Sequence, residues 1–138
     1  MQVGIKFSIA IHVVLAACFF KDEKVTSEFI AGSINTNPVI VRRLLGTLKA
    51  AGLVNVVAGV GGVSLTKEPK DINLLQIFNA VNNKEKLFKI HSDSPKACPL
   101  GGKIEGLLTG HFLKAQEALE NSLRSITLQD LLDELINL

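Results

Sequence analysis

Apolar residues fill almost every position of residues 7–20, and shorter segments that mix apolar and polar positions follow. Inside this run the apolar positions recur with the spacing of one helical face, at Phe7, Ile11, Val14, Leu15 and Cys18. The run is shorter than the roughly 20 apolar residues that a membrane-spanning helix needs. The pattern therefore predicts a buried first helix.

A lipoprotein signal is the alternative interpretation of the same run. Lys6 supplies a positive charge before it, and residues 15–18 (LAAC) resemble the cleavage box of a bacterial lipoprotein. Ser8 and His12, however, interrupt the apolar stretch, and only one lysine precedes it. These polar interruptions favour a helix in the core of the protein.

Two helices separated by a short turn are expected next. Thr26 or Ser27 can cap the first of them, which runs to about residue 33 with Phe29 and Ile30 facing inward. In the second, Asn37 is a strong N-cap and Pro38 has its φ preset for the first helical position. This helix runs to about Ala51, before a C-capping Gly52, and buries one stripe: Val41, Leu44, Leu45 and Leu48.

Beyond residue 52 the pattern predicts a β-hairpin, a helix, an irregular segment, a long helix and a short last helix. The strands span 53–57 and 63–66, and the later segments span 72–81, 82–103, 104–123 and 127–137. The glycine-rich stretch 58–62 joins the strands. Asp71 is expected near the start of the 72–81 helix, and Thr127 and Asp130 form a capping-box-like pair.

These elements predict a mostly helical fold with a small β-hairpin, a winged helix-turn-helix followed by a long C-terminal dimerisation helix. The expected division is residues 1–81 for DNA binding, 82–103 as a linker or sensor segment, and 104–138 for the dimerisation helix and C-terminal helix. A helix of about 20 residues is about 30 Å long and must cover something, and a second copy of the chain is the natural candidate. Its apolar stripe comprises Ile104, Leu107, Leu108, Phe112, Ala115, Leu119 and Leu123.

Length and charge are consistent with this interpretation. The 138 residues fit one domain, and 47% of them are hydrophobic. The net charge is only +2, but residues 1–66 carry six basic and three acidic side chains, whereas residues 104–138 carry two basic and six acidic ones. A basic front and an acidic back indicate that the front meets a polyanion.

A winged helix-turn-helix places its second helix in the major groove of duplex DNA, and a glycine-rich tip lets the wing approach the backbone closely. Arg42 and Arg43 can contact phosphate or a guanine edge. The expected DNA-binding residues are Lys6, Thr36, Asn37, Pro38, Val39, Arg42, Arg43, Gly59, Val60, Gly61 and Gly62. A small helical domain whose arginine pair is merely solvated is the alternative.

Several motifs, taken together, resemble the Rrf-two (Rrf2) family of bacterial regulators, which includes IscR, NsrR and CymR. They are residues 6–10 (KFSIA), 33–39 (SINTNPV), 42–45 (RRLL), 51–54 (AGLV), 59–62 (GVGG) and 126–128 (ITL). Residues 87–91 (LFKIH) and 98–101 (CPLG) are similar to its cluster-free branch. The resemblance implies a dimeric winged-helix transcription factor, usually a repressor, on a pseudo-palindromic site in double-stranded DNA.

Two departures from the family pattern change what the resemblance implies. Cluster-binding members carry three cysteines before the dimerisation helix, whereas only Cys98 lies there in this chain, so no iron–sulfur cluster and no other cofactor is expected. The wing has Ala58 where the family commonly has arginine, which removes a minor-groove contact. The alternative function is a dimeric winged-helix protein-interaction module that has lost DNA binding.

The remaining candidates for chemistry are few. Cys98 follows Lys96, a cation that would lower its pKa, so a redox-sensing role is one hypothesis and an incidental cysteine the other. His12, His91 and His111 lack the short spacing of a metal site. With no catalytic triad or phosphate loop, we expect a cytoplasmic, non-enzymatic protein without a membrane partner, whose effector is a small molecule or another protein.

Overall fold

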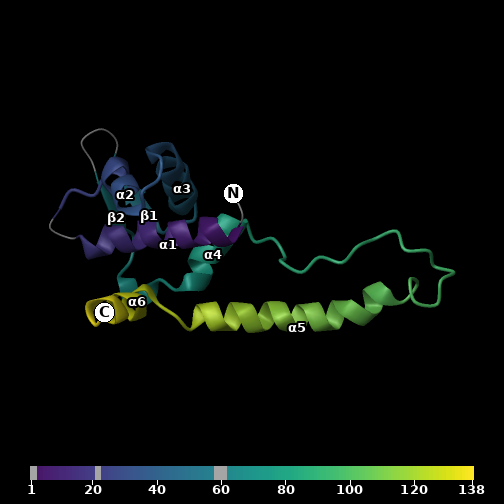
Figure 1. Ribbon diagram of the computed structural model, residues 1–138. Helices are drawn as coiled ribbons and strands as arrows, with labels where there is room; N and C mark the ends of the chain where they lie inside the picture. The colour runs from purple at the N-terminus through teal and green to yellow at the C-terminus, as the bar shows by residue number, and fades with distance from the viewer. Residues whose placement is uncertain (1–2, 21–22, 58–61) are drawn as a thin grey trace.

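The computed structural model describes residues 3–20, 23–57 and 62–138. Within them, helices and one hairpin follow in the expected order (Figure 1). They are α1 (Val3–Phe19), α2 (Ser27–Ile34), α3 (Pro38–Ala50), β1 (Val54–Val56), β2 (Val63–Leu65), the 3-10 helix η1 (Pro69–Asp71), α4 (Leu74–Asn82), α5 (Ile104–Arg124) and α6 (Leu128–Ile136). The prediction of a mostly helical fold with one antiparallel hairpin is confirmed.

Helix α1 lies at the centre of the head, which comprises α1–α4, the hairpin and α6. It contacts α2, α3, α4, β2 and α6. Ala10, Val13 and Val14 have no exposed surface. A helix that is apolar on nearly all sides is stable in water only when neighbours surround it, which is the arrangement seen here.

The buried face of α1 is broader than the predicted stripe. Val14 and Cys18 are buried as expected, whereas Phe7, Ile11 and Leu15 are only half-buried. The difference arises because α1 has partners on several sides rather than one. Among the described residues, no helix combines the length and the hydropathy needed to cross a bilayer.

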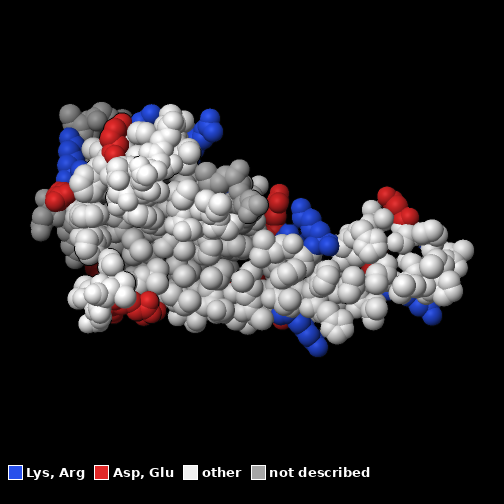
Figure 2. All heavy atoms as spheres, in the orientation of Figure 1, with Lys and Arg blue, Asp and Glu red and all other residues white. Residues whose placement is uncertain are grey.

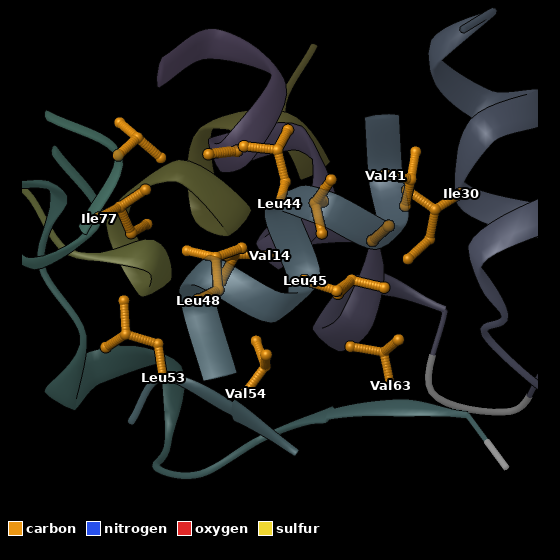
Figure 3. Packing of buried hydrophobic residues seen from close by; sticks show 14 of the residues in the cluster. Val14, Ile30, Val41, Leu44, Leu45, Leu48, Leu53, Val54, Val63 and Ile77 are labelled. Carbon is orange, nitrogen blue, oxygen red and sulfur yellow. The ribbon is translucent and has the colours of Figure 1, made fainter. Parts of the chain in front are cut away.

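Helix α3 contributes four apolar side chains to the core of the head. Its predicted inward stripe is confirmed, since Val41, Leu44, Leu45 and Leu48 are all buried. Figure 3 shows these side chains packed with Ile30 of α2 and with residues of the hairpin. Burying an aliphatic side chain of this size contributes about 1.5–3 kcal/mol, so the stripe fixes which face of α3 stays in solvent.

Helix α4 begins later than the sequence pattern predicts. Ile72, the expected first residue, is fully buried just before the helix, and Asp71 ends the preceding η1. Asn73 is the N-cap and forms a capping box with Gln76, in which the two side chains accept backbone N–H groups at 3.0 and 2.9 Å. This reciprocal cap satisfies two helix-end donors at once and fixes the start of α4 at Leu74.

The C-terminal helix packs back on the head. Thr127 caps α6 through the predicted capping box with Asp130, and Leu128 is fully buried. The N–H of Leu74 bonds the carbonyl of Ile126 at 2.9 Å, so the starts of α4 and α6 are joined by a short antiparallel bridge. Residues 104–138 therefore divide in space, with α6 in the head and α5 outside it (Figure 1).

Helix α5 and the segment 83–103 form an arm that projects from the head (Figure 1). The chain leaves α4 through Asn83 and Lys84, both with positive φ. It then runs outward beside α5, reverses direction, and returns towards the head as α5 itself. Phe88 of the segment packs against Phe112 of α5 with ring centroids 5.8 Å apart. None of the 21 residues of α5 is buried.

The start of α3 depends on one side chain. Asn37 Oδ1 accepts the N–H of Val39 at 2.9 Å, and Pro38 occupies the first helical position. Replacing a good N-cap by alanine typically costs about 1 kcal/mol. We therefore expect Asn37→Ala to lower the free energy of unfolding by about 1 kcal/mol in urea denaturation, because the N–H of Val39 loses its partner.

Serine caps helices about as well as asparagine, so Asn37→Ser is the matched control and should retain nearly the full stability. Equal losses for the alanine and serine variants would show that the cap does not hold the start of α3.

Candidate nucleic-acid interface

The turn between α2 and α3 sets the direction of the exposed helix. Asn35 adopts a left-handed conformation, and the N–H groups of Asn35 and Thr36 both bond the carbonyl of Ala31, at 2.8 and 3.0 Å. These bonds close α2 and turn the chain within three residues into the Asn37 cap. Thr36 and Pro38 are half-buried in this turn, and Asn37 is exposed.

The solvent face of α3 carries three of the predicted site residues. Val39, Arg42 and Arg43 are exposed, on the side opposite the buried stripe. Val39 lies in the first turn of the helix, and the arginines lie in the second. The structure therefore brings these three side chains to the N-terminal half of one exposed helix face.

The two arginines of α3 lie against different neighbours. Arg42 lines a hollow of about 430 Å³ shared with the start of α2, Lys49 and the base of the hairpin. Arg43 lines another hollow, of about 500 Å³, together with Lys6 of α1. Lys6, which is distant in sequence, is thus placed on the same side of the head as Arg43.

The hairpin flanks α3. Val54 pairs with Leu65 and Val56 with Val63, and the N–H of Val63 bonds the carbonyl of Val25 at 2.8 Å. A Cβ on Gly62 would lie 3.2 Å from that same carbonyl, so this position favours glycine. The rest of the predicted wing tip, Gly59, Val60 and Gly61, lies outside the described residues, as does Ala58.

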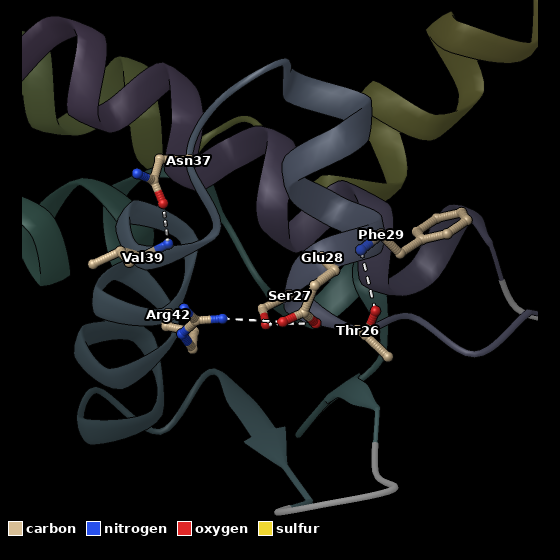
Figure 4. A network of polar contacts seen from close by, with 7 residues as sticks. All are labelled: Thr26, Ser27, Glu28, Phe29, Asn37, Val39 and Arg42. Atoms are coloured by element: carbon tan, nitrogen blue, oxygen red, sulfur yellow. Dashed lines mark hydrogen bonds and ion pairs between the residues drawn. The ribbon is translucent and has the colours of Figure 1, made fainter.

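An acidic residue that the sequence analysis did not single out lies within the site. Arg42 Nη1 donates to Glu28 Oε1 at 3.0 Å, and the two side chains are 53% and 67% exposed (Figure 4). Ser27 Oγ bonds the other carboxylate oxygen of Glu28 at 3.2 Å. Glu28 and Arg42 are 14 positions apart in the sequence and meet because α2 and α3 pack together. A local sequence pattern therefore does not predict this ion pair.

The surroundings of Glu28 favour its ionised form. Its own backbone N–H in the first turn of α2 lowers its pKa the most, followed by the Ser27 hydroxyl and then by Arg42. A carboxylate is also favourable at a helix N-terminus. Figure 2 shows basic and acidic side chains close together on the end of the head that holds α2 and α3, so this end is mixed in charge.

Cys98 lies in a tight turn near the far end of the arm. The thiol is exposed, and its sulfur accepts the N–H of Gly101 at 3.3 Å. Backbone N–H groups of Gly101 and Leu100 lower the pKa of Cys98 below its ordinary value. A Cβ on Gly102 would lie 2.6 Å from the carbonyl of Lys96, so the turn requires glycine there.

The stripe expected on α5 is divided between two environments. Leu107 is 59% exposed and Ala115 is exposed as well. The other members, which are half-buried, are Ile104, Leu108, Phe112, Leu119 and Leu123. Of these, Phe112 packs on Phe88 of the neighbouring segment and Leu123 packs against the core of the head. Leu113, outside the stripe, is also exposed.

The sequence of this chain is similar to those of known transcriptional regulators. Residues 3–134 match the Rrf2 family, described as iron-dependent transcriptional regulators. YwnA of Bacillus subtilis strain 168, described as an HTH-type transcriptional regulator, is 42% identical over 134 residues, which are 97% of this chain and 99% of that protein.

The fold of this chain is also similar to those of solved structures of DNA-binding and regulatory proteins. One, described as a DNA-binding protein, is 42% identical, with a TM-score of 0.74 over 92% of this chain and 98% of that chain. A transcriptional regulator from Lactobacillus plantarum is 26% identical, with a TM-score of 0.80 over 95% of this chain and 89% of the other.

The fold and the exposed face of α3 define a winged helix-turn-helix regulator. The chain belongs to the Rrf2 family of transcriptional regulators. The resemblance inferred from its motifs is thereby confirmed, and the family is one of regulators rather than enzymes.

The iron in the family's description does not fit the side chains that the structure describes. Within residues 3–20, 23–57 and 62–138, no three His, Cys, Asp or Glu side chains gather where they could hold a metal ion. Cys98 is exposed on the arm, whereas Cys18 is buried in α1. A site with three cysteine ligands therefore cannot form from the residues of the arm.

Proposed function

We propose that this protein binds operator DNA sequence-specifically as a homodimeric repressor of transcription in the bacterial cytoplasm. The observation that carries the proposal is the exposed N-terminal half of α3, where Val39, Arg42 and Arg43 are in solvent and Arg42 lines a hollow with the base of the hairpin. Membership of a family of transcriptional regulators supports it, as does the DNA-binding description of a 42% identical structure.

In the proposed complex α3 enters the major groove of the duplex, with Val39, Arg42 and Arg43 near base edges or the walls of the groove. Lys6, Thr36, Asn37 and Pro38 lie on the approach to the groove and contact its phosphates. Gly59, Val60, Gly61 and Gly62 are the proposed contacts of the wing with the sugar-phosphate backbone, since glycine has no side chain to block a close approach.

The arm is the proposed dimer interface. A helix of 21 residues with no buried residue exposes Leu107 and Leu113, which two chains related by a two-fold axis can bury together. In the proposed dimer, the seven residues of the predicted stripe belong to the interface. Two copies of α3 would then lie one or more helical turns apart along the DNA, which matches a pseudo-palindromic operator.

The arm is also the proposed place of the regulatory signal. A hollow of about 410 Å³ lies between residues 86–90 and α5, large enough for a small-molecule effector. Cys98 is the proposed redox-sensing residue, because its exposed thiol has a lowered pKa. A partner protein that binds the same arm is the other candidate effector.

Selection on a random-duplex library at about 0.15 M salt should recover an inverted repeat, because two identical reading heads impose two-fold symmetry on the site.

Arg43→Ala should weaken binding to the recovered operator by about 1–3 kcal/mol if Arg43 reads a base, or mainly reduce the salt dependence if it contacts phosphate. Fluorescence anisotropy over a salt series measures both.

Arg124→Ala is the matched control, since it removes the same side chain from the end of α5. Failure to enrich any motif, with only weak salt-sensitive binding, would instead support the protein-interaction module.

Leu107→Glu should convert the protein from dimer to monomer in sedimentation equilibrium, since a charge in an apolar interface cannot be solvated. Ile136 of α6, which is 75% exposed, provides the control, and Ile136→Glu should leave the dimer intact. A Leu107→Glu protein that stays dimeric would place the interface elsewhere.

Mild peroxide treatment should reduce operator binding by the wild-type protein and leave Cys98→Ser unaffected, because only a thiolate in that turn is oxidised rapidly. Cys18→Ser is the control. Because Cys18 is buried, this variant should lose operator binding on peroxide treatment to the same extent as wild type. Equal sensitivity of wild type and Cys98→Ser would exclude the sensing role.

A further inference from the structure

Glu28 is an acidic residue on the face that the proposed function brings to DNA. It lies in the first turn of α2, beside the second turn of α3, and lines the same hollow as Arg42 and Lys49. A carboxylate there repels the phosphates of any duplex that approaches. The carboxylate of Glu28 is therefore expected to have a benefit for binding that outweighs its repulsion of the phosphates.

Strengthening the fold through the ion pair with Arg42 is not that benefit. The Glu28 and Arg42 side chains are both more than half exposed, and exposed ion pairs of this kind add little to stability. The core beneath them is formed by the apolar stripe of α3 and does not involve either charge.

The pair has a clear effect on the charge and position of Arg42. The carboxylate accepts one bond from Nη1 of the guanidinium, at 3.0 Å, and is itself held by Ser27 (Figure 4). A guanidinium has five N–H donors, so enough remain for the two bonds that a guanine edge accepts. Arg42 is therefore oriented before DNA arrives, and its positive charge is offset.

Arg43 shows the contrast. It is the next residue on α3 and is exposed, but within the described part of the chain its guanidinium forms no ion pair. An unpaired arginine is attracted by any phosphate, whatever the sequence. A paired arginine gains less from phosphate alone, because the adjacent carboxylate cancels much of that attraction.

We propose that Glu28 is a specificity-determining positioning residue that holds Arg42 for a base edge and suppresses its attraction to non-specific DNA. The inference rests on the proposed function, since it needs this face to bind duplex DNA. It assigns Arg42 to discrimination between sequences and Arg43 to general affinity.

The test compares wild type, Glu28→Gln and Arg42→Ala on the selected operator and on a scrambled duplex of equal length. Glutamine keeps the shape of the side chain and removes its charge. We expect Glu28→Gln to bind scrambled DNA more tightly than wild type, because Arg42 becomes free to contact phosphate. One added phosphate contact makes this gain shrink by about three- to fourfold between about 0.05 and 0.2 M salt.

Repeated library selection gives the second readout. We expect Glu28→Gln to lose at least about fivefold of the preference at one base pair of each half-site, the lower end of what one guanine contact contributes. It should be the same base pair whose preference disappears in Arg42→Ala. A merely structural residue would not weaken the preference at a single, shared position.

Glu134→Gln is the control, because it removes one exposed carboxylate from α6 without touching α2 or α3, and its binding should equal that of wild type. Glu28→Asp keeps the charge and should restore the low affinity for scrambled DNA. Circular dichroism and melting temperature verify that each variant is folded.

The outcomes separate the two proposals. If Glu28→Gln behaves like Glu134→Gln, or tightens operator and scrambled DNA equally with unchanged base preference, the role of Glu28 is refuted. If Glu28→Asp binds scrambled DNA as tightly as Glu28→Gln, the offset of charge is refuted. If wild type shows no preference for any duplex, the proposed function itself fails.

Discussion

Enclosure of the apolar helix α1 is the constraint on which the head depends. A helix with Ala10, Val13 and Val14 fully buried must be covered from several directions, and α2, α3, α4, β2 and α6 supply that cover. Because α3 buries Val41, Leu44 and Leu48 in the core that it shares with α1, its opposite face is left in solvent. The surface that can meet DNA is therefore a consequence of how the first helix is buried.

Much of this architecture was predictable because its signals are local. The Asn37–Pro38 start of α3, its apolar stripe and the Thr127 cap of α6 each depend on a few neighbouring residues. The start of α4 at Leu74 differs from the predicted one. The local capping box of Asn73 and Gln76 outweighs the apolar periodicity that favours Ile72. Asn73 is also bridged to Thr127, more than 50 positions away. Periodicity reports which residues favour a helix and carries no information about such distant backbone pairing.

The candidate site divides in the same way. Val39, Arg42 and Arg43 were predicted from α3 itself, since the buried stripe leaves them outside. The contact between Glu28 and Arg42, and the proximity of Lys6 to Arg43, depend on how separate helices cross. The half-buried state of Phe112 likewise reflects contact with Phe88, which lies in a segment without regular pattern.

The antiparallel bridge between Asn73 and Thr127 fixes the base of the arm to the head, while the other end of α5 lies about 31 Å away. Such a rod acts as a lever. A tilt of about ten degrees at the bridge displaces its far end by about 5 Å. The backbone hydrogen bonds at the base of the arm join the start of α6 to the start of α4, and α4 packs on α3, so they lie on a packed connection from α5 to α3.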